Sequence, residues 1–485
     1  MTKLENFLIQ NGSYINGKWH NKGDATFDVL NPADGSKIKT LVDASNEDLD
    51  SAIVAANEAL PAWRAKTAKE RAAVLRKWYN LIIENQEDLA HIMTMEQGKP
   101  LAESRGEIVY GANYVEWFAE EAKRVYGDTI PGPSGDKRIV VIKQPVGVVC
   151  TITPWNFPSS MITRKVAPAL AAGCTVISKP AKETPLSAIA LAVLGEQAGI
   201  PAGVFNLVVT TRSREVGSII CNDTRIDKVS FTGSTEVGGR LLSMCGSTIK
   251  KTSMELGGNA PFIVFDDADI DSAVEGALLS KYRNAGQTCV CSNRIMVQEG
   301  IYDEFAERLA AKVRELKLGN GTDKGVNIGP LINANAVEAM ESFVKDAVGA
   351  GATVLEGGKR SDLGDFFFEP TVITNVSSGM KIAKLEIFGP IAPLMKFSSE
   401  EEAIEIANDT VFGLASYVFT RDIGRIWRVA EALEYGMVGI NEGIISNEMA
   451  PFGGVKQSGL GREGSKYGLE DYLEIKYLCM GGLDQ

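Results

Sequence analysis

Histidine is almost absent from this chain of 485 residues. Its two histidines, His20 and His91, both lie in the N-terminal fifth of the sequence. This scarcity nearly excludes a histidine-based catalytic triad or a histidine-rich metal site, so no metal is expected. Any acid–base chemistry would fall to glutamate, aspartate, lysine, tyrosine or cysteine.

An excess of positive charge is also missing. The chain has 50 lysines and arginines against 62 aspartates and glutamates, which gives a net charge of −12. Such a protein offers no general basic surface, so neither nucleic acid nor an anionic membrane is expected as a partner. An anionic ligand would have to be bound by a local cluster of lysine, arginine or backbone N–H groups.

Long hydrophobic runs and paired cysteines are lacking as well. No apolar run approaches the ~20 residues that a bilayer span requires, and the N-terminus has no stretch typical of a signal peptide. The seven cysteines are scattered and odd in number, without CxxC or zinc spacing. This pattern indicates reduced thiols, and we expect a cytoplasmic protein unless a targeting peptide has been removed.

What the chain does have is the composition of a large globular protein. Hydrophobic residues make up 45% and charged residues 23%, and the length corresponds to two to four domains. Residues 45–125 show helical, amphipathic patterns. From residue 138, β-branched runs alternate with helical stretches, which indicates a parallel α/β sheet covered on both faces. A second alternating region spans 258–440, so two α/β domains are expected to meet near Gly257 and Gly258.

The strands of both regions can be predicted from their apolar, β-branched runs. The last run, 472–478, is predicted to pair either outside its own domain or as the final strand of the local sheet. The other predicted strands are 146–153, 174–178, 204–210 and 228–232, followed by helices beginning near Pro158, Pro185, Ser213 and Thr235, and then 261–265, 294–298 and 415–419.

Two strand ends in the first region are candidates for a nucleotide site, because open α/β sheets bind ligands at the carboxyl ends of their strands. No GxGxxG motif is present. Gly233 and Ser234 instead lie where a strand leads into a helix, and their small size would let a pyrophosphate approach the helix N-terminus. Lys179 ends another strand. Taken alone, each segment is explained at least as well by packing or by a solvated lysine.

Several further motifs resemble those of the aldehyde dehydrogenase superfamily and follow the order found there. The resemblance covers nearly the whole chain, and the combination is specific although no single motif is. The motifs are 154–158 (PWNFP), 254–259 (MELGGN), 282–289 (YRNAGQTC), 386–390 (EIFGP) and 451–459 (PFGGVKQSG).

The resemblance implies three structural parts and self-association. A Rossmann-like cofactor domain would comprise 1–121 and 144–256, and an α/β catalytic domain would comprise 257–469. A small β element for oligomerisation would be built from 122–143 and 470–485. The expected assembly is a homodimer or a homotetramer.

The same resemblance implies a thiol mechanism. Cys289 would attack an aldehyde, since a thiolate adds readily to a carbonyl carbon and later leaves readily from a thioester. Asn156 and the Cys289 backbone N–H would bind the resulting oxyanion, and Glu255 would activate the water that hydrolyses the thioester. The alternative roles are an inert thiol, a helix cap and a salt-bridged glutamate, respectively.

A nicotinamide cofactor is implied, and the loop charges favour NADP over NAD. NAD-preferring members usually have a glutamate three residues after the strand-end lysine, whereas this chain has Lys182, a cation that would attract a 2′-phosphate. Arg212 and Arg214 add positive charge at a second strand end, while Glu183 is a competing carboxylate, and all of these side chains also fit solvated loop charges. The implied cofactor contacts are Thr153, Trp155, Lys179, Lys182, Arg212, Gly233, Ser234, Leu256 and Glu386, the last holding the nicotinamide ribose.

Three residues indicate the substrate. Arg164, Arg283 and Ser446 look like the positions at which succinate-semialdehyde dehydrogenases hold the distal carboxylate of their substrate. Arginine binds carboxylates through paired hydrogen bonds, although each arginine could instead pair with a structural acid. We therefore expect oxidation of succinate semialdehyde to succinate, with glutarate semialdehyde or a broader range of aldehydes as the alternative.

Other classes are disfavoured by residues that are present. CoA-acylating relatives lack the base equivalent to Glu255, and a non-catalytic member would have lost Glu255 or Cys289. Cys291 adds a possible redox function, because residues two apart in an extended segment share a face. A disulfide between Cys289 and Cys291 would be strained and easily reduced; the alternative for Cys291 is a small packing residue.

Overall fold

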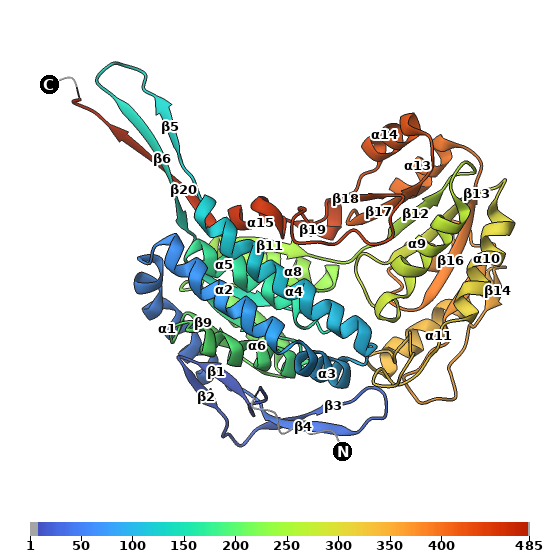
Figure 1. Cartoon of the computed structure of the whole chain (residues 1–485), viewed down its shortest axis with the longest axis horizontal. Coiled ribbons are helices and arrows are strands. Elements are labelled where there is room, and N and C mark those ends of the chain that lie inside the picture. Colours follow the sequence, from blue (N-terminus) through green and yellow to red (C-terminus); the bar gives the residue numbers. More distant parts are fainter. Residues whose placement is uncertain (1–7, 484–485) are drawn as a thin grey trace.

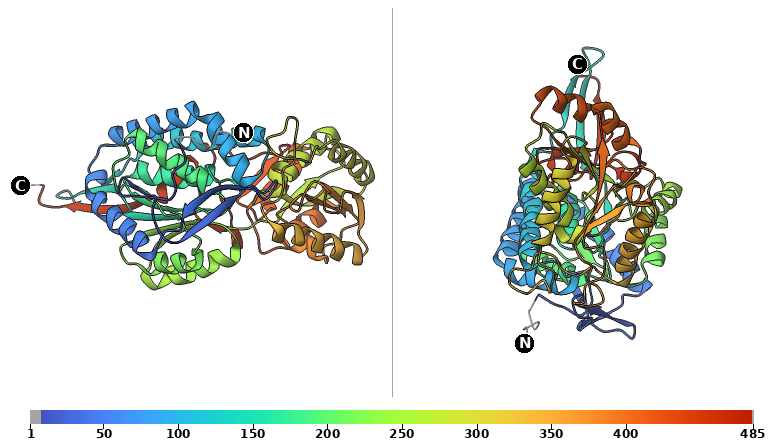
Figure 2. Two further views of the ribbon diagram at one scale, coloured as in Figure 1. Left: turned by 90° about the horizontal axis from the view of Figure 1, so that it is seen from below. Right: turned by 90° about the vertical axis from the view of Figure 1, so that its right-hand side faces the viewer.

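The structure is a computed structural model that describes residues 8–483. It contains two large sheets, each covered by helices, and a narrow three-stranded arm (Figure 1). In Figure 1 and in the left view of Figure 2, the arm and the second sheet lie at opposite ends of the molecule. The expected architecture of two α/β units with a small β element is confirmed.

The first sheet has the order β19-β11-β10-β7-β8-β9-β1-β2, and its five central strands are parallel. The four strands predicted for this region are confirmed, with β9 three residues shorter at its end than expected. The strands are β1 (Ser13–Ile15), β2 (Lys18–His20), β7 (Val148–Ile152), β8 (Thr175–Lys179), β9 (Phe205–Leu207), β10 (Lys228–Thr232), β11 (Lys251–Glu255) and β19 (Gly459–Leu460).

Helices cover both faces of this sheet and bury two separate apolar clusters against it. One cluster is formed by α2 to α6 and the other by α1, α7 and α8. α5 is buried along its entire length, so each of its polar side chains needs a partner inside the protein. The helices are α1 (Asn46–Arg64), α2 (Ala68–Glu84), α3 (Gln86–Gln97), α4 (Leu101–Glu121), α5 (Ser160–Ala172), α6 (Pro185–Ala198), α7 (Ser213–Asn222), α8 (Thr235–Cys245) and α15 (Ser465–Glu470).

The second sheet has the order β14-β15-β16-β13-β12-β17-β18. The three strands predicted here are confirmed as β12, β13 and β17. The strands are β12 (Ala260–Val264), β13 (Ser292–Gln298), β14 (Thr353–Glu356), β15 (Thr371–Thr374), β16 (Ile391–Phe397), β17 (Ala415–Phe419) and β18 (Met437–Ile440), and the helices are α9 (Ile270–Tyr282), α10 (Tyr302–Arg314), α11 (Ala334–Gly349), α12 (Lys381–Lys384), α13 (Glu400–Asn408) and α14 (Ile423–Ala432).

The chain passes from the first sheet to the second between β11 and β12, at Gly257 and Gly258. It later returns, because β19 pairs with β11 and α15 packs against α4 and α5. β19, and α15 except for its last residue, Glu470, lie inside the range 257–469 that was predicted for the catalytic domain. The three domain ranges therefore stay predictions, and the sheets themselves are joined by a chain that crosses between them more than once.

The arm is an antiparallel sheet of β5 (Asp128–Pro131), β6 (Arg138–Pro145) and β20 (Leu473–Met480), in the order β20-β6-β5. The last predicted strand thus pairs with β6, outside the second α/β sheet. A separate hairpin, β3 (Thr26–Leu30) with β4 (Lys37–Val42), lies beside the N-terminal end of the described chain (Figure 1). Among residues 8–483, no helix is long and apolar enough to cross a membrane.

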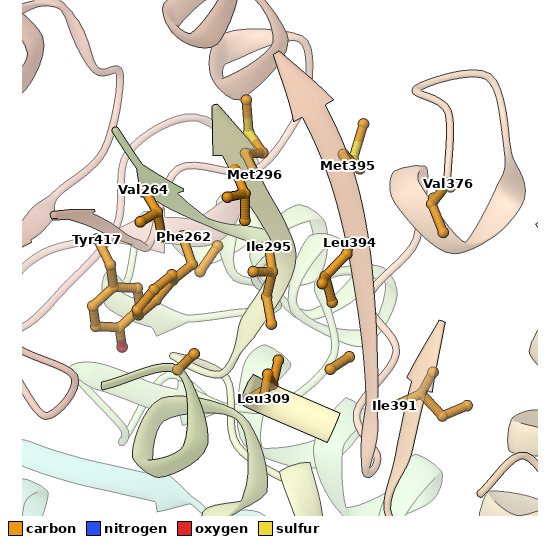
Figure 3. Packing of buried hydrophobic residues seen from close by; sticks show 14 of the residues in the cluster. Phe262, Val264, Ile295, Met296, Leu309, Val376, Ile391, Leu394, Met395 and Tyr417 are labelled. Carbon is orange, nitrogen blue, oxygen red and sulfur yellow. The ribbon is translucent and has the colours of Figure 1, made fainter. Parts of the chain in front are cut away.

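The core of the second sheet is closely packed around Phe262 on β12. Its ring stacks on Phe419, with centroids 4.8 Å apart, and lies 5.7 Å from the ring of Tyr417. Figure 3 shows the Phe262 and Tyr417 side chains facing the same layer as Ile295 and Leu394. Phe262 is fully buried, so its removal would leave a cavity that the neighbouring strands cannot fill.

We expect Phe262→Ala to lower the free energy of unfolding by about 3–5 kcal/mol, because burial is lost and a cavity remains. Trp427→Ala is the matched control, since Trp427 is an aromatic residue that is 63% exposed on α14. That control should change stability by less than about 0.5 kcal/mol. Urea unfolding followed by circular dichroism measures both variants, and equal midpoints would contradict the assignment of Phe262 to this core.

Candidate active site

Cys289 lies at the meeting point of two cavities. One, of about 380 Å³, opens at the carboxyl ends of the first sheet's strands and is called here the strand-end cavity. The other, called the arginine pocket, contains Arg164, Arg283 and Ser446. Both are lined by Cys289, so the same residue borders the two cavities.

The segment before Cys289 has an unusual backbone. Asn284, Ala285 and Gly286 all have φ between 53° and 73°, a left-handed conformation that costs about 1–2 kcal/mol for each non-glycine residue. A Cβ at Gly286 would sit 2.2 Å from the Gly389 carbonyl oxygen, so only glycine fits there. Strain of this kind, held by surrounding structure, is typical of functional sites.

Asn156 is placed against the same turn. Its side-chain Nδ2 donates to the Gln287 carbonyl at 2.9 Å, and its Oδ1 is buried with no hydrogen-bond partner among the described residues. The Asn156 backbone carbonyl accepts from Asn284 Nδ2 at 2.9 Å. The structure therefore brings Asn156 to the turn that ends in Cys289, as expected from the sequence.

Glu255 ends β11 and is buried, and neither carboxylate oxygen has a hydrogen-bond partner in the described part of the chain. Burial, reinforced by the carboxylate of Glu463, raises the pKa of Glu255 well above its usual range. The Glu463 carboxyl is itself buried, but ion pairs with Arg164 and Lys165 hold its pKa below the usual range. Glu255 thus holds a proton readily, while its neighbour stays ionised.

The Cys289 thiol resists ionisation in this setting. Burial raises its pKa to about 12, and the Glu386 and Glu255 carboxylates push it in the same direction. Desolvation of the half-buried Glu386 raises the pKa of its own carboxyl to about 7, and its Oε1 accepts the Gly258 backbone N–H at 3.0 Å. At neutral pH the resting sulfur is therefore a thiol, and it needs a base to become a nucleophile.

Eight of the nine residues predicted to contact the cofactor line the strand-end cavity or the cavity of about 250 Å³ that adjoins it. The two cavities share Pro154, Thr232, Gly233 and Ser234. Lys179 Nζ donates to Ser213 Oγ at 2.6 Å, and burial lowers its pKa to about 8. The eight are Thr153, Trp155, Lys179, Lys182, Gly233, Ser234, Leu256 and Glu386.

Arg212 is the exception among these predicted contacts. It lies outside the residues that line either cavity, because its guanidinium turns toward α1 and donates to the Ala44 carbonyl. A carboxylate oxygen of Glu215 lies 3.9 Å from the same guanidinium. Of the loop charges weighed from the sequence, Lys182 and the competing carboxylate of Glu183 both line the adjoining cavity of about 250 Å³.

The arginine pocket gathers the three residues predicted to bind the substrate. The Arg164 guanidinium is paired with Glu463 and lies 4.0 Å from the ring centroid of Phe452, so the alternative reading of a structurally paired arginine also applies to it. Within residues 8–483 Arg283 forms no ion pair, and its guanidinium lies 5.4 Å from the Phe157 ring. The pocket thus has one arginine whose charge is partly compensated and one whose charge is available.

Cys291 is not placed as the sequence led us to expect. The extended segment assumed for residues 289–291 is wrong: the chain turns there, and the Cys291 N–H donates to the Thr288 carbonyl at 3.1 Å. The Cys291 sulfur contacts the Lys281 carbonyl at 3.4 Å and is absent from the lining of either cavity around Cys289. Its redox role stays a prediction, without the shared face that motivated it.

Four buried residues around the site were not found from the sequence: Lys99, Glu107, Lys165 and Glu463. Lys99 forms an ion pair with Glu107, and Glu463 forms ion pairs with Arg164 and Lys165. Lys165 and Glu463 are 298 positions apart in the sequence. No local pattern reports such a pair. Among the described residues, no group of three histidine, cysteine or acidic side chains is arranged to hold a metal ion.

A model of the aldehyde dehydrogenase family matches residues 19–478 of the chain. Three relatives are similar over nearly their whole length: 3-sulfolactaldehyde dehydrogenase of Pseudomonas putida (60% identity, 99% of this chain and 98% of that protein), NADP(+)-dependent succinate-semialdehyde dehydrogenase of Escherichia coli K12 (60%, 98% and 98%) and glutarate-semialdehyde dehydrogenase of Pseudomonas putida KT2440 (61%, 98% and 98%). The crystal structure of an aldehyde dehydrogenase from Brucella melitensis biovar abortus 2308 superposes with a TM-score of 0.97 at 60% identity, covering 99% of each chain.

The raised pKa of Cys289 predicts how the protein reacts with iodoacetamide. Because the thiolate fraction grows tenfold per pH unit below the pKa, labelling of Cys289 should accelerate about tenfold per unit from pH 7 to pH 9. Glu386→Gln removes a carboxylate that raises this pKa and should speed labelling at a fixed pH. Glu341→Gln, an exposed carboxylate on α11, is the control. Peptide mass spectrometry follows the reaction, and a rate that does not change with pH would contradict the buried thiol.

Proposed function

The chain belongs to the aldehyde dehydrogenase family, and we propose that it oxidises succinate semialdehyde to succinate with NADP as the hydride acceptor. The observation that carries this proposal is the position of Cys289 between the strand-end cavity and the arginine pocket. A nicotinamide in the first cavity and an anionic aldehyde in the second would meet at the same sulfur. Bringing two reactants to one nucleophile in this way is a major source of rate enhancement.

The arginine pocket supports an aldehyde with an anionic far end. The three relatives above are named for aldehydes that carry a carboxylate or a sulfonate away from the reacting carbon. Arg283 brings a guanidinium without an acidic partner in the described chain, and Ser446 adds a hydroxyl to the same pocket. A short dicarboxylic semialdehyde matches this donor set, and glutarate semialdehyde, one methylene longer, is the nearest competitor.

The residues of the strand-end cavity fit a nicotinamide dinucleotide. Thr153 and Thr232 each have a buried hydroxyl with no partner in the described residues, and both line the cofactor side of the site. Ser234 caps α8 by accepting the Val237 N–H, so the cavity also opens onto a helix N-terminus that favours phosphate. When bound there, the dinucleotide supplies a ring carbon that accepts a hydride.

We assign the covalent steps to three residues. In its ionised form Glu255 takes the proton of Cys289 Sγ, and the sulfur adds to the aldehyde carbon while Asn156 Nδ2 and the Cys289 N–H donate to the oxygen that becomes negative. Departure of the hydride leaves a thioester on the sulfur. After Glu255 has passed that first proton to solvent, it takes a proton from water, and the water oxygen attacks the thioester carbon. The thiolate leaves as the carboxylic acid forms and is reprotonated. One water is consumed and one proton is released per aldehyde oxidised to the acid, and a second proton is released when the acid ionises to the carboxylate.

We propose that self-association uses the arm. Ile475 and Tyr477 on β20 are exposed at 73% and 61%, and apolar side chains on a projecting sheet are unfavourable in water. A homodimer or homotetramer would cover them. A cytoplasmic location stays an expectation based on the scattered, unpaired cysteines.

The substrate proposal predicts a selective loss in Arg283→Met. Hydrogen bonds to charged groups are worth about 1.5–3 kcal/mol, so kcat/KM for succinate semialdehyde should fall about 10–150-fold. With butanal, an uncharged aldehyde of the same length, kcat/KM of Arg283→Met should fall less than about threefold. With the semialdehyde, kcat/KM of Arg283→Lys should lie between that of the native enzyme and that of Arg283→Met. The assay follows NADPH absorbance without CoA or phosphate. Equal losses for both aldehydes, or no NADPH from the native enzyme with the semialdehyde, would contradict the proposal.

The cofactor proposal predicts that Lys182→Glu reverses the preference for NADP. A carboxylate at this position would repel the 2′-phosphate that the ammonium group attracts, so the ratio of kcat/KM for NADP to that for NAD should fall at least about tenfold. Arg212→Glu makes the same change of charge outside the cavity and should leave the ratio within about twofold. A native preference for NAD, or an equal response of the two variants, would count against Lys182.

A further inference from the structure

Lys99 is a buried cation that none of the steps above uses. It follows Gly98 between α3 and α4, and its side chain is completely shielded from solvent. Its ammonium group donates to Glu107 Oε2 at 2.5 Å and to the backbone carbonyl of Asn156 at 2.7 Å, and it lies 4.0 Å from the ring centroid of Phe157. A buried charge is stable only when it is paired and hydrogen-bonded. Here one of the two hydrogen bonds of the ammonium group goes to the backbone of Asn156, the residue expected to bind the oxyanion.

Glu107 extends the same contact to the helix behind Asn156. Its second oxygen, Oε1, accepts the backbone N–H groups of Ser159 at 3.0 Å and Ser160 at 3.2 Å. These are among the unpaired donors at the start of α5, where a carboxylate is favoured by both hydrogen bonding and the helix dipole. The two residues of this ion pair therefore both bind backbone near the oxyanion residue. Lys99 binds the carbonyl of Asn156, and Glu107 binds the N–H groups of Ser159 and Ser160.

The Asn156 peptide is fixed from both sides by this arrangement. Its carbonyl oxygen accepts Lys99 Nζ from the α3–α4 connection and Asn284 Nδ2 from the strained turn before Cys289. Holding that carbonyl in place restricts rotation of the backbone at Asn156, and this limits where Cβ and the side-chain amide can lie. A donor in an oxyanion site is effective only if it is already in position when negative charge develops.

We infer that Lys99 is a positioning residue for the oxyanion site: its ammonium group, held by Glu107, fixes the Asn156 peptide so that the Asn156 amide faces the reacting carbon. This inference rests on the proposed thiol mechanism. It assigns to Lys99 no contact with substrate or cofactor, and Lys99 lines neither the strand-end cavity nor the arginine pocket.

A purely structural role for Lys99 is the competing explanation. The backbone here meets the second α/β unit, since the Leu101 N–H donates to the Gly321 carbonyl at 2.9 Å, and a Cβ on Gly329 would sit 2.1 Å from the Gly98 carbonyl oxygen. Loss of Lys99 could therefore weaken the whole molecule. The two explanations differ in whether the effect of Lys99 passes through the Asn156 side chain.

A double-mutant cycle on the full-length protein separates them. Lys99→Met, which keeps the chain length without the charge, should lower kcat about 10²-fold, the loss typical of a misplaced catalytic group. The Kd for NADP, from quenching of protein fluorescence, should stay within about twofold. In the Asn156→Ala background the same Lys99→Met change should cost less than about threefold, because the group that it positions is already gone.

Lys228→Met is the matched control. Lys228 is also a fully buried lysine, and it is hydrogen-bonded to Ser253. It lies at the start of β10, whereas Thr232, which lines the strand-end cavity, lies at the end of that strand. Its kcat should stay within about threefold of the native value. If Lys99→Met is insoluble, Glu107→Gln, which preserves shape, takes its place in the cycle under the same criteria.

Three results would overturn the inference: an unchanged kcat in the Lys99 variant, the same fold-loss with and without the Asn156 amide, or an equal loss in Lys228→Met. The cycle is measured with whichever aldehyde the native enzyme oxidises fastest. An enzyme that prefers another aldehyde would contradict the proposed substrate while leaving the inference about Lys99 open to the same test.

Discussion

The buried ion pairs of α5 are the interactions on which the rest of the site depends. Lys165 and Arg164 on this helix both pair with Glu463, which lies between β19 and α15 and so belongs to the part of the chain that returns from the second sheet. Removing one partner of a buried pair costs about 3–5 kcal/mol, because the other charge is left without compensation. The pairs therefore hold the returning segment against the first sheet. They also fix the Arg164 guanidinium at the wall of the arginine pocket.

Burial also sets the chemistry of the site. Glu255 is buried, Cys289 and Glu386 are half-buried, and desolvation raises the pKa of each of the three. These three groups therefore keep their protons up to a higher pH than they would in water. An acidic chain with a net charge of −12 can still attract an anionic aldehyde, since the attraction needed is local and Arg283 lies in the pocket itself.

Much of the fold could be predicted because its strands are apolar and β-branched, as in β7, β8, β10 and β17. β11 was missed since it reads Lys-Thr-Ser-Met-Glu, and its polar side chains are satisfied by partners such as Asp471 that only the folded chain brings near. Motif context singled out Cys289 and Asn156, which line the same cavity, and Glu255, whose carboxylate raises the pKa of the Cys289 thiol. It was insufficient for Arg212 and Cys291, because the local backbone directs both side chains away from the cavities around Cys289. It was also insufficient for Lys99, because its hydrogen-bond partner Asn156 is 57 positions away in the sequence.

The claim at the centre of this account is that Cys289 carries the oxidised substrate as a thioester that Glu255 helps to hydrolyse. It is tested most directly by mixing the Glu255→Gln enzyme with succinate semialdehyde and NADP, quenching in acid, and analysing peptides by mass spectrometry. The account predicts a succinyl group on the Cys289 peptide in an amount equal to the NADPH formed in the first turnover. NADPH formation without a succinyl group on Cys289 would contradict it.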